Sequence, residues 1–235
     1  MNHLFKNCLS LLILCLCISS AKAQVGINYK QYEFGIGLDF NTPYTDAQTS
    51  KSSRSARLNF TYNATPFVNY VVEMQTGNLQ GGDALNTTTG RQFTNAYNAV
   101  MLRGQLQGGE ILDYSDGGVK NALKNLYVSS GLGVILNDLK EINRYSIKVP
   151  GFYTPGSDKS KQLVVPLRLG YEFKIYNSYS EPHIKIDLGY QYNFILGDGL
   201  DGFEAGTQKD SYAQFGIGIK YAFGQIATYR KPISN

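Results

Sequence analysis

Few side chains in this sequence have the type and spacing that catalysis requires. Acyl-transfer and hydrolytic sites usually combine a histidine with an acid and a hydroxyl, and this chain has two histidines, His3 and His183. Asp187 shares a predicted strand face with His183 but lies four residues away, roughly 13 Å along an extended chain and beyond hydrogen-bond reach. The sequence therefore predicts no catalytic residues, and the protein is not expected to be an enzyme.

Cofactor and metal motifs are also missing from the sequence. The glycine pairs do not complete G-x-G-x-x-G, and G-x-x-x-x-G-K-[ST] does not occur. The acids of Asp198-Gly-Leu-Asp201 faintly resemble a calcium loop but lack its pattern. The cysteines, Cys8, Cys15 and Cys17, all lie in the first 23 residues. We expect no cofactor and no metal site.

The N-terminal segment has the layout of a secretory signal peptide. Lys6 precedes an apolar run over 9–18, and the small-residue site 21–23, Ala-Lys-Ala, precedes Gln24. A membrane anchor is the competing interpretation, but about ten apolar residues are too few for a spanning helix. A lipoprotein is a further alternative, although neither Cys15 nor Cys17 lies in a suitable small-residue pattern. We predict that residues 1–23 are a cleaved signal peptide.

The charge balance excludes one class of partner. Cleavage would remove Lys6 and Lys22, leaving 20 basic and 18 acidic side chains and a net charge of +2. A near-neutral chain has no basic field suited to nucleic acid.

The clearest structural signal is a pair of alternating segments over 163–175 and 184–194. Leu167, Leu169 and Tyr171 share one face of the first segment, and polar side chains alternate with them. The short link 176–182 favours an antiparallel hairpin. Each segment reaches the roughly 9–11 residues that a tilted strand needs to cross a bilayer.

The same alternation recurs along the chain. On 96–106, Ala, Val and Leu at 96, 100, 102 and 106 alternate less regularly with Tyr, Met and Arg at 97, 101 and 103. An even number of strands is typical of bacterial outer-membrane barrels. We predict an all-β fold, an eight-stranded antiparallel up-and-down transmembrane β-barrel over 24–224, followed by a periplasmic tail over 225–235. The predicted strands are 32–40, 55–62, 68–75, 96–106, 126–136, 163–175, 184–194 and 212–223.

Connection lengths agree with this topology, because such barrels have long outer loops and short periplasmic turns. The predicted outer loops are 41–54, 77–95, 137–162 and 195–211, and the predicted periplasmic links are 63–66, 107–125 and 176–182. Within 107–125, the run 119–125 is either a short amphipathic helix at the barrel rim or membrane interface, or a plain surface turn. The sequence leaves both open.

Charged side chains are predicted to point into the barrel. An eight-stranded barrel is too narrow to hold the apolar stripes of all its strands, and the glycines on the polar faces would relieve crowding inside it. Aromatic residues near the strand ends would form an interfacial girdle. Charges of both signs in a narrow interior should pair, with Lys185 or Lys220 as candidate partners of Asp187. The expected interior charges are Glu33, Asp39, Arg57, Glu73, Arg168, Glu172, Lys174, Lys185, Asp187 and Lys220, and Arg103 is a further candidate.

The closing run Gly216-Ile-Gly-Ile-Lys-Tyr-Ala-Phe-Gly224, the Ala-Gln junction after the signal segment and the eight-strand layout resemble the small outer-membrane β-barrel proteins of Bacteroidetes. The resemblance implies location in the cell outer membrane, contact with its lipid and lipopolysaccharide, and insertion by the outer-membrane assembly machinery. That machinery reads the last strand, and here a tail follows Phe223.

Two function classes remain open. One is a structural or surface-interaction barrel with a packed polar interior, whose loops meet extracellular ligands. The other is a narrow transport channel lined by the interior charges, or a component of the envelope machinery. A soluble periplasmic lipocalin-like barrel, with its apolar face inside, is a further alternative.

Overall fold

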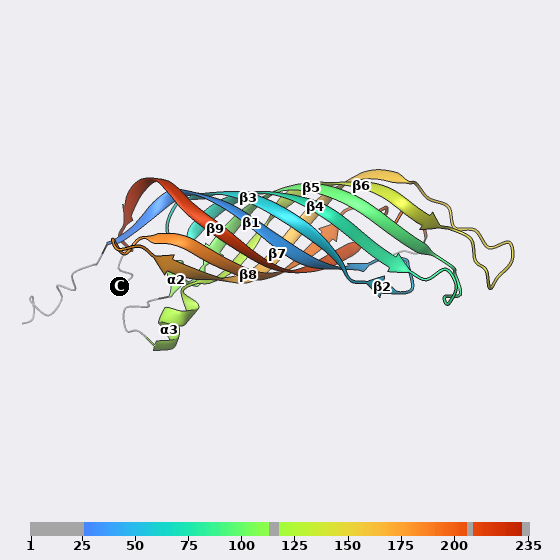
Figure 1. Cartoon of the computed structure of the whole chain (residues 1–235), viewed down its shortest axis with the longest axis horizontal. Coiled ribbons are helices and arrows are strands. Elements are labelled where there is room, and N and C mark those ends of the chain that lie inside the picture. The colour runs from blue at the N-terminus through green and yellow to red at the C-terminus, as the bar shows by residue number, and fades with distance from the viewer. Residues whose placement is uncertain (1–25, 113–117, 206–208, 232–235) are drawn as a thin grey trace, which may run out of the picture.

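The computed structural model describes residues 26–112, 118–205 and 209–231. Its strands form one closed, elongated barrel, with the paired residues Ile27 and Tyr229 at one end (Figure 1). The predicted signal peptide and the last four residues of the predicted tail lie outside the described residues. We call the end with Ile27 and Tyr229 the inner end, and the opposite end the outer end.

Every pair of neighbouring strands is antiparallel, and chain neighbours are sheet neighbours around the ring. The two-residue strand β2 (Ser50–Lys51) pairs with the outer end of β4 (Val68–Gly82) and only extends the wall there. Eight long strands within the described ranges therefore close the ring, and the predicted fold class is confirmed. The strands are β1 (Ile27–Tyr44), β2 (Ser50–Lys51), β3 (Ser53–Asn63), β4 (Val68–Gly82), β5 (Gln92–Gln107), β6 (Leu126–Asn143), β7 (Lys159–Tyr176), β8 (Pro182–Ile195) and β9 (Ser211–Tyr229).

The strands are strongly staggered. Cross-strand partners followed once around the ring from Tyr32 return to β1 at Thr42, ten residues further along, which is a shear number of 10. A closed barrel requires such a stagger together with tilted strands. Partners in the ladder therefore lie at different depths along the barrel axis.

The strands are longer than the alternation predicted, mainly toward the outer end. For example, β6 continues past Leu136 to Asn143, and β7 begins at Lys159 rather than at Leu163. At the inner end, β9 does not stop at Phe223 but continues to Tyr229, paired with β1. Five residues of the predicted tail are thus part of the wall.

The longest inner link contains two short helices, α2 (Gly108–Ile111) and α3 (Gly118–Leu123). The alternating period ends at Gln107, where Gly-Gly follows and the chain turns. Among the described residues, no helix is long and apolar enough to cross a membrane.

Candidate functional site: the filled lumen

The two faces of the wall have opposite chemistry. On β1, Glu33 and Asp39 are each 1% exposed, while Ile36 and Leu38 are 55% and 62% exposed. The less regular strand β5 follows the same rule, with Leu102 outside and Arg103 buried. A wall whose apolar side chains face outward on every strand is stable only in lipid. The lipocalin-like alternative, which needs the reverse, is wrong.

The innermost layer of the lumen is a carboxylate and ammonium cluster near the inner mouth. Lys185 Nζ lies 2.5 Å from Glu33 Oε1 and 3.3 Å from Glu172 Oε2, and Lys220 Nζ lies 2.6 Å from Glu172 Oε1. Lys174 donates instead to the Gln107 side chain at 2.7 Å. The ion pairs thus join β1, β9, β8 and β7, which are consecutive strands of the ring.

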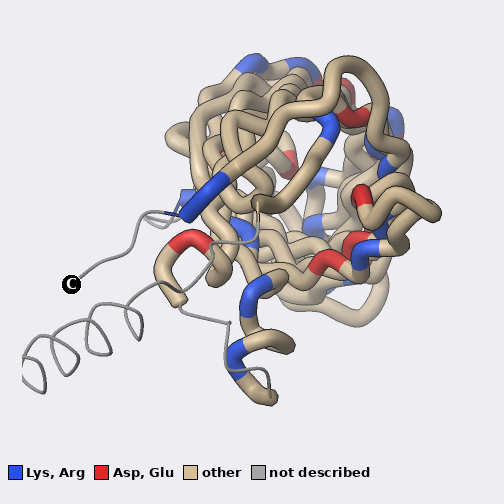
Figure 2. The backbone as a smooth tube through the Cα atoms, turned by 90° about the vertical axis from the view of Figure 1, so that its left-hand side faces the viewer, with Lys and Arg blue, Asp and Glu red and all other residues tan. Residues whose placement is uncertain are grey.

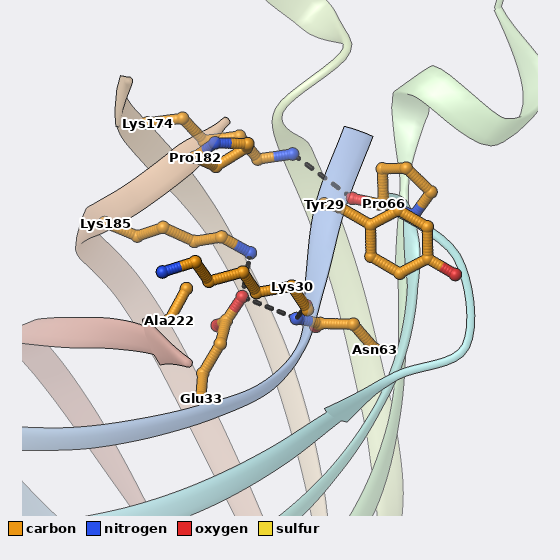
Figure 3. Close-up of a pocket in the computed structure, with 9 residues that line it drawn as sticks. All are labelled: Tyr29, Lys30, Glu33, Asn63, Pro66, Lys174, Pro182, Lys185 and Ala222. Carbon is orange, nitrogen blue, oxygen red and sulfur yellow. Dashed lines mark hydrogen bonds and ion pairs between the residues drawn. The ribbon is translucent and has the colours of Figure 1, made fainter. Parts of the chain in front are cut away.

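A small cavity of about 10 Å³ opens beside this cluster. Lys185 and Asn63 converge on Glu33 at its edge, while Lys174 reaches over to Pro66 (Figure 3). The cavity has room for about one water molecule and none for a larger solute.

The middle layer is built from guanidinium groups. Asp187 Oδ2 lies 2.9 Å from Arg168 Nη2 and 3.2 Å from Arg57 Nη2, and Arg57 also pairs with Asp39. Tyr127 donates to Asp187 Oδ1 at 2.5 Å. The partners of Asp187 are therefore arginines on β3 and β7, and not Lys185 or Lys220 as the sequence suggested.

One further ion pair completes this layer. Arg103 Nη2 lies 2.5 Å from Glu73 Oε2, and Arg103 Nη1 donates to Ser129 at 2.9 Å. Each charge is thus compensated by a partner on another strand, which offsets the desolvation that a buried ion suffers.

Amide side chains replace the charges toward the outer end. Gln214 donates to Asn41 at 2.9 Å and accepts from Asn193 at 2.9 Å and from Gln75 at 3.2 Å. All four side chains are at most 3% exposed. The amides form a third polar layer, held without ionic groups.

The outer mouth is closed by an apolar cluster. Leu200 and Phe203, from the loop 196–210, are completely buried among the inward side chains at the outer ends of the strands. Arg91 lies over the Phe203 ring at 5.8 Å and donates to Asp46 and Thr154, which ties three further loops to this plug. The members of the cluster are Ala47, Leu79, Phe93, Tyr97, Ala99, Met101, Ile135, Leu139, Val164, Ile195, Leu200, Phe203 and Tyr212.

Two carboxylates hold the plug loop in place. Asp210 accepts from the backbone of Gly199 and Leu200 at 3.0 and 2.8 Å, and Asp201 accepts from Phe203 and Asp46 at 3.0 Å. Burial raises the pKa of Asp210 to about 8, and the neighbouring Asp201 carboxylate adds to the rise. Burial likewise raises the pKa of Asp201 to about 6.

The inner mouth is crossed by the ends of β1 and β9. Both strands bend where β1 has a bulge between Lys30 and Tyr32 and where Gly224 adopts a φ of +88°. Beyond the bend, Tyr229 donates to Glu110 at 2.9 Å. Because α2 follows β5, and the β5–β6 side of the ring lies opposite the β9–β1 side, this contact spans the opening. We call residues 27–30 and 225–231 the strap.

The structure brings the predicted interior charges together in two clusters. All except Lys174 are at most 4% exposed, and Arg103 is 5% exposed. Sequence reasoning did not identify Tyr127, the amide layer, the apolar plug or the strap. Only the alternation after Gly224, with Ala227 and Tyr229 on one face, signalled that the strand continues.

The residues with catalytic potential do not meet. His183 Nδ1 lies 3.3 Å from Lys30 Nζ, and the ring packs edge-on against Tyr221, whereas Asp187 is bound to the arginines deeper in the lumen. Within the described ranges, no group of three or more His, Cys, Asp or Glu side chains is arranged to hold a metal ion.

Comparison with known proteins supports the fold. No protein-family model matches the sequence, and no curated protein sequence matches it. Among solved structures, the chain is similar to Neisserial surface protein A, with a TM-score of 0.50 and 11% identity over 82% of this chain and 97% of that chain.

Two other solved structures are similar at lower TM-scores. Ail, the attachment invasion locus protein of Yersinia pestis, gives 0.44 with 14% identity over 83% of this chain and 99% of that chain. OprG from Pseudomonas aeruginosa, an outer membrane protein, gives 0.41 with 16% identity over 84% and 98%. At such identities the likeness concerns the fold alone. The apolar outer wall and the likeness in fold to Neisserial surface protein A make this chain a transmembrane β-barrel of the outer-membrane type.

Proposed function

We propose that this chain is an integral outer-membrane protein that does not conduct, with a structural or surface-interaction role. The observation that carries the proposal is the filled lumen. Two ionic layers, an amide layer and an apolar plug follow one another along the axis, and the strap crosses the inner mouth. The interior charges act in this proposal as a core that holds the wall together, rather than as a selectivity filter.

The outer loops supply the surface through which such a protein would meet extracellular ligands. The loop 144–158 between β6 and β7 extends furthest from the barrel (Figure 1). It exposes Tyr145 and Tyr153, whose ring centroids are 5.0 Å apart. Paired tyrosines give a large contact area at a small cost in side-chain entropy, as binding surfaces do. We also propose that this chain is not an enzyme.

The remaining parts of the proposal concern biogenesis. A signal peptide over 1–23 would be cleaved before Gln24, and the outer-membrane assembly machinery would insert the barrel among lipid and lipopolysaccharide. The sequence resemblance to Bacteroidetes barrels supports this part. N-terminal sequencing of the protein extracted from outer membranes tests it, and a first residue other than Gln24 would contradict the cleavage site.

Conductance in planar lipid bilayers tests the proposed function itself. We expect no unitary current steps from the purified, folded protein. A preparation of Leu188→Arg, a variant expected to insert poorly, is the matched control, because contaminating porins would appear in both samples. Reproducible steps found only with the native protein would establish the channel alternative. An envelope-machinery role would instead appear as a defined partner in cross-linked outer membranes.

A further inference from the structure

The two helices of the longest inner link, between β5 and β6, lie in different surroundings. Its first part, α2, lies over the inner mouth and binds the strap through Glu110. Its second part, α3, lies beside the barrel, outside the ring of strands, as the end-on view shows (Figure 2). A segment outside the ring contacts hydrocarbon, lipid headgroups or water, depending on its depth along the barrel axis. The depth of α3 therefore decides its environment.

One hydrogen bond fixes that depth. The hydroxyl of Tyr171 donates to the carbonyl of Ala122, within α3, at 2.9 Å. Tyr171 is an outward residue of β7, and its ring packs against Phe173 with the centroids 4.7 Å apart. These two rings lie near the inner end of β7, where aromatic side chains mark the boundary between hydrocarbon and headgroups. Thus α3 lies at the inner membrane interface.

The side chains of this part of the link are apolar and unburied. Val119 is 75% exposed and Leu123 is 41% exposed. Val119 and Leu123 are four residues apart and share one face of α3. No residue of α3 is buried against the barrel. In water this arrangement would leave a group of large apolar side chains without cover.

The charge on α3 fits the headgroups of phospholipid. Lys120 is exposed and lies in the last turn, and α3 itself carries no acidic side chain in its first turn. Tyr171 also links α3 directly to the outward face of β7. A basic, short amphipathic element beside a membrane-spanning wall is suited to the interface.

We propose that α3 is an interfacial anchor, with Val119 and Leu123 in the acyl chains of the inner leaflet and Lys120 at the phosphates. The anchor holds the α3 part of the link in the membrane, while α2 holds the strap over the inner mouth. This inference does not depend on whether the barrel conducts.

Tryptophan fluorescence tests the proposal cleanly, because the chain contains no tryptophan. Val119→Trp and Leu123→Trp are reconstituted separately into phospholipid vesicles with brominated acyl chains. Leu38→Trp, in the lipid-facing belt, is the positive control, and Leu85→Trp, in an outer loop, is the negative control. Folding of each variant is checked by heat-modifiable gel mobility, so that only folded barrels are compared.

We expect both link variants to be quenched to at least half the extent of Leu38→Trp, and Leu85→Trp to remain unquenched. Quenching of both no greater than that of Leu85→Trp would overturn the proposal and assign the face to water or a soluble protein. Lys120→Glu in the Val119→Trp background should lower quenching in vesicles with anionic lipid more than in zwitterionic vesicles. Equal quenching in the two would overturn the role given to Lys120.

Discussion

The inner and outer halves of the lumen are filled by different chemistry. The inner half contains ion pairs among Asp187, Arg57 and Arg168 and among their neighbours, whereas the outer half contains amides around Gln214 and then the apolar plug. The ion pairs of the inner half are formed by strand residues alone, while the outer half needs the loop 196–210. The difference shows that a narrow barrel can be filled either from its wall or from its loops.

Strand β8 passes through both halves and offers a series of tests. Its largest expected effect is that of Asp187→Asn in the inner half. This change leaves Arg168 without its carboxylate in a buried site, and removing one partner of a buried pair costs about 3–5 kcal/mol. Urea titration in lipid vesicles measures the loss. The control, Asp138→Asn, removes an exposed pair with Lys140 and should change stability by less than about 1 kcal/mol.

The next residue, Leu188, separates the lumen from the lipid face. Leu188→Arg should cost roughly 2–4 kcal/mol, the range for arginine on the lipid face near the membrane midplane. Heat-modifiable gel mobility after folding into vesicles reports insertion. Normal insertion of this variant would mean that the wall does not meet lipid there.

Gly189→Ala tests crowding in the inner half. A Cβ at Gly189 would lie 2.7 Å from the Arg168 guanidinium, so overpacking should cost about 1–3 kcal/mol. Gly104→Ala is the matched control, since its Cβ would meet no atom within 4 Å among the described residues. Equal urea midpoints for the two variants would contradict a packed interior.

The outer half should be more tolerant of lost polarity. Gln191 donates to Asn193 at 2.8 Å and to Gln214 at 3.3 Å, so Gln191→Leu removes neutral hydrogen bonds only. The cost should be about 1 kcal/mol, well below that of Asp187→Asn in the same titration. A cost equal to that of Asp187→Asn would remove the distinction between the two halves.

The plug loop should respond to pH. The folded pKa values of Asp201, about 6, and Asp210, about 8, exceed the unfolded value of about 4, so the folded loop binds more protons. Their contribution to stability is complete below about pH 4 and is lost as the pH rises through 8, at most about 1.4 kcal/mol per pH unit for each group. Protease cleavage within 196–210 should therefore be faster at pH 8.5 than at pH 6. Asp210→Asn should reduce that difference.

The wall could be predicted from the sequence because alternation is a local property. Even Arg103, on the least regular strand, lies on the face that its spacing indicated. The partner of Asp187 could not be predicted in the same way, because it depends on which strands the ring brings face to face. The burial of Leu200 and Phe203 depends on the width of the lumen, so a loop rich in glycine and aspartate gave no local sign of it.

The strap also has a consequence for the order of folding. Tyr229 and Glu110 are 119 residues apart in the chain, and they come together across a mouth that exists only once the first and last strands have paired. Such a long-range contact forms after the local hairpins, because its loop-closure entropy must first be met by them. We therefore expect the strap to close last, after the ring of strands is complete.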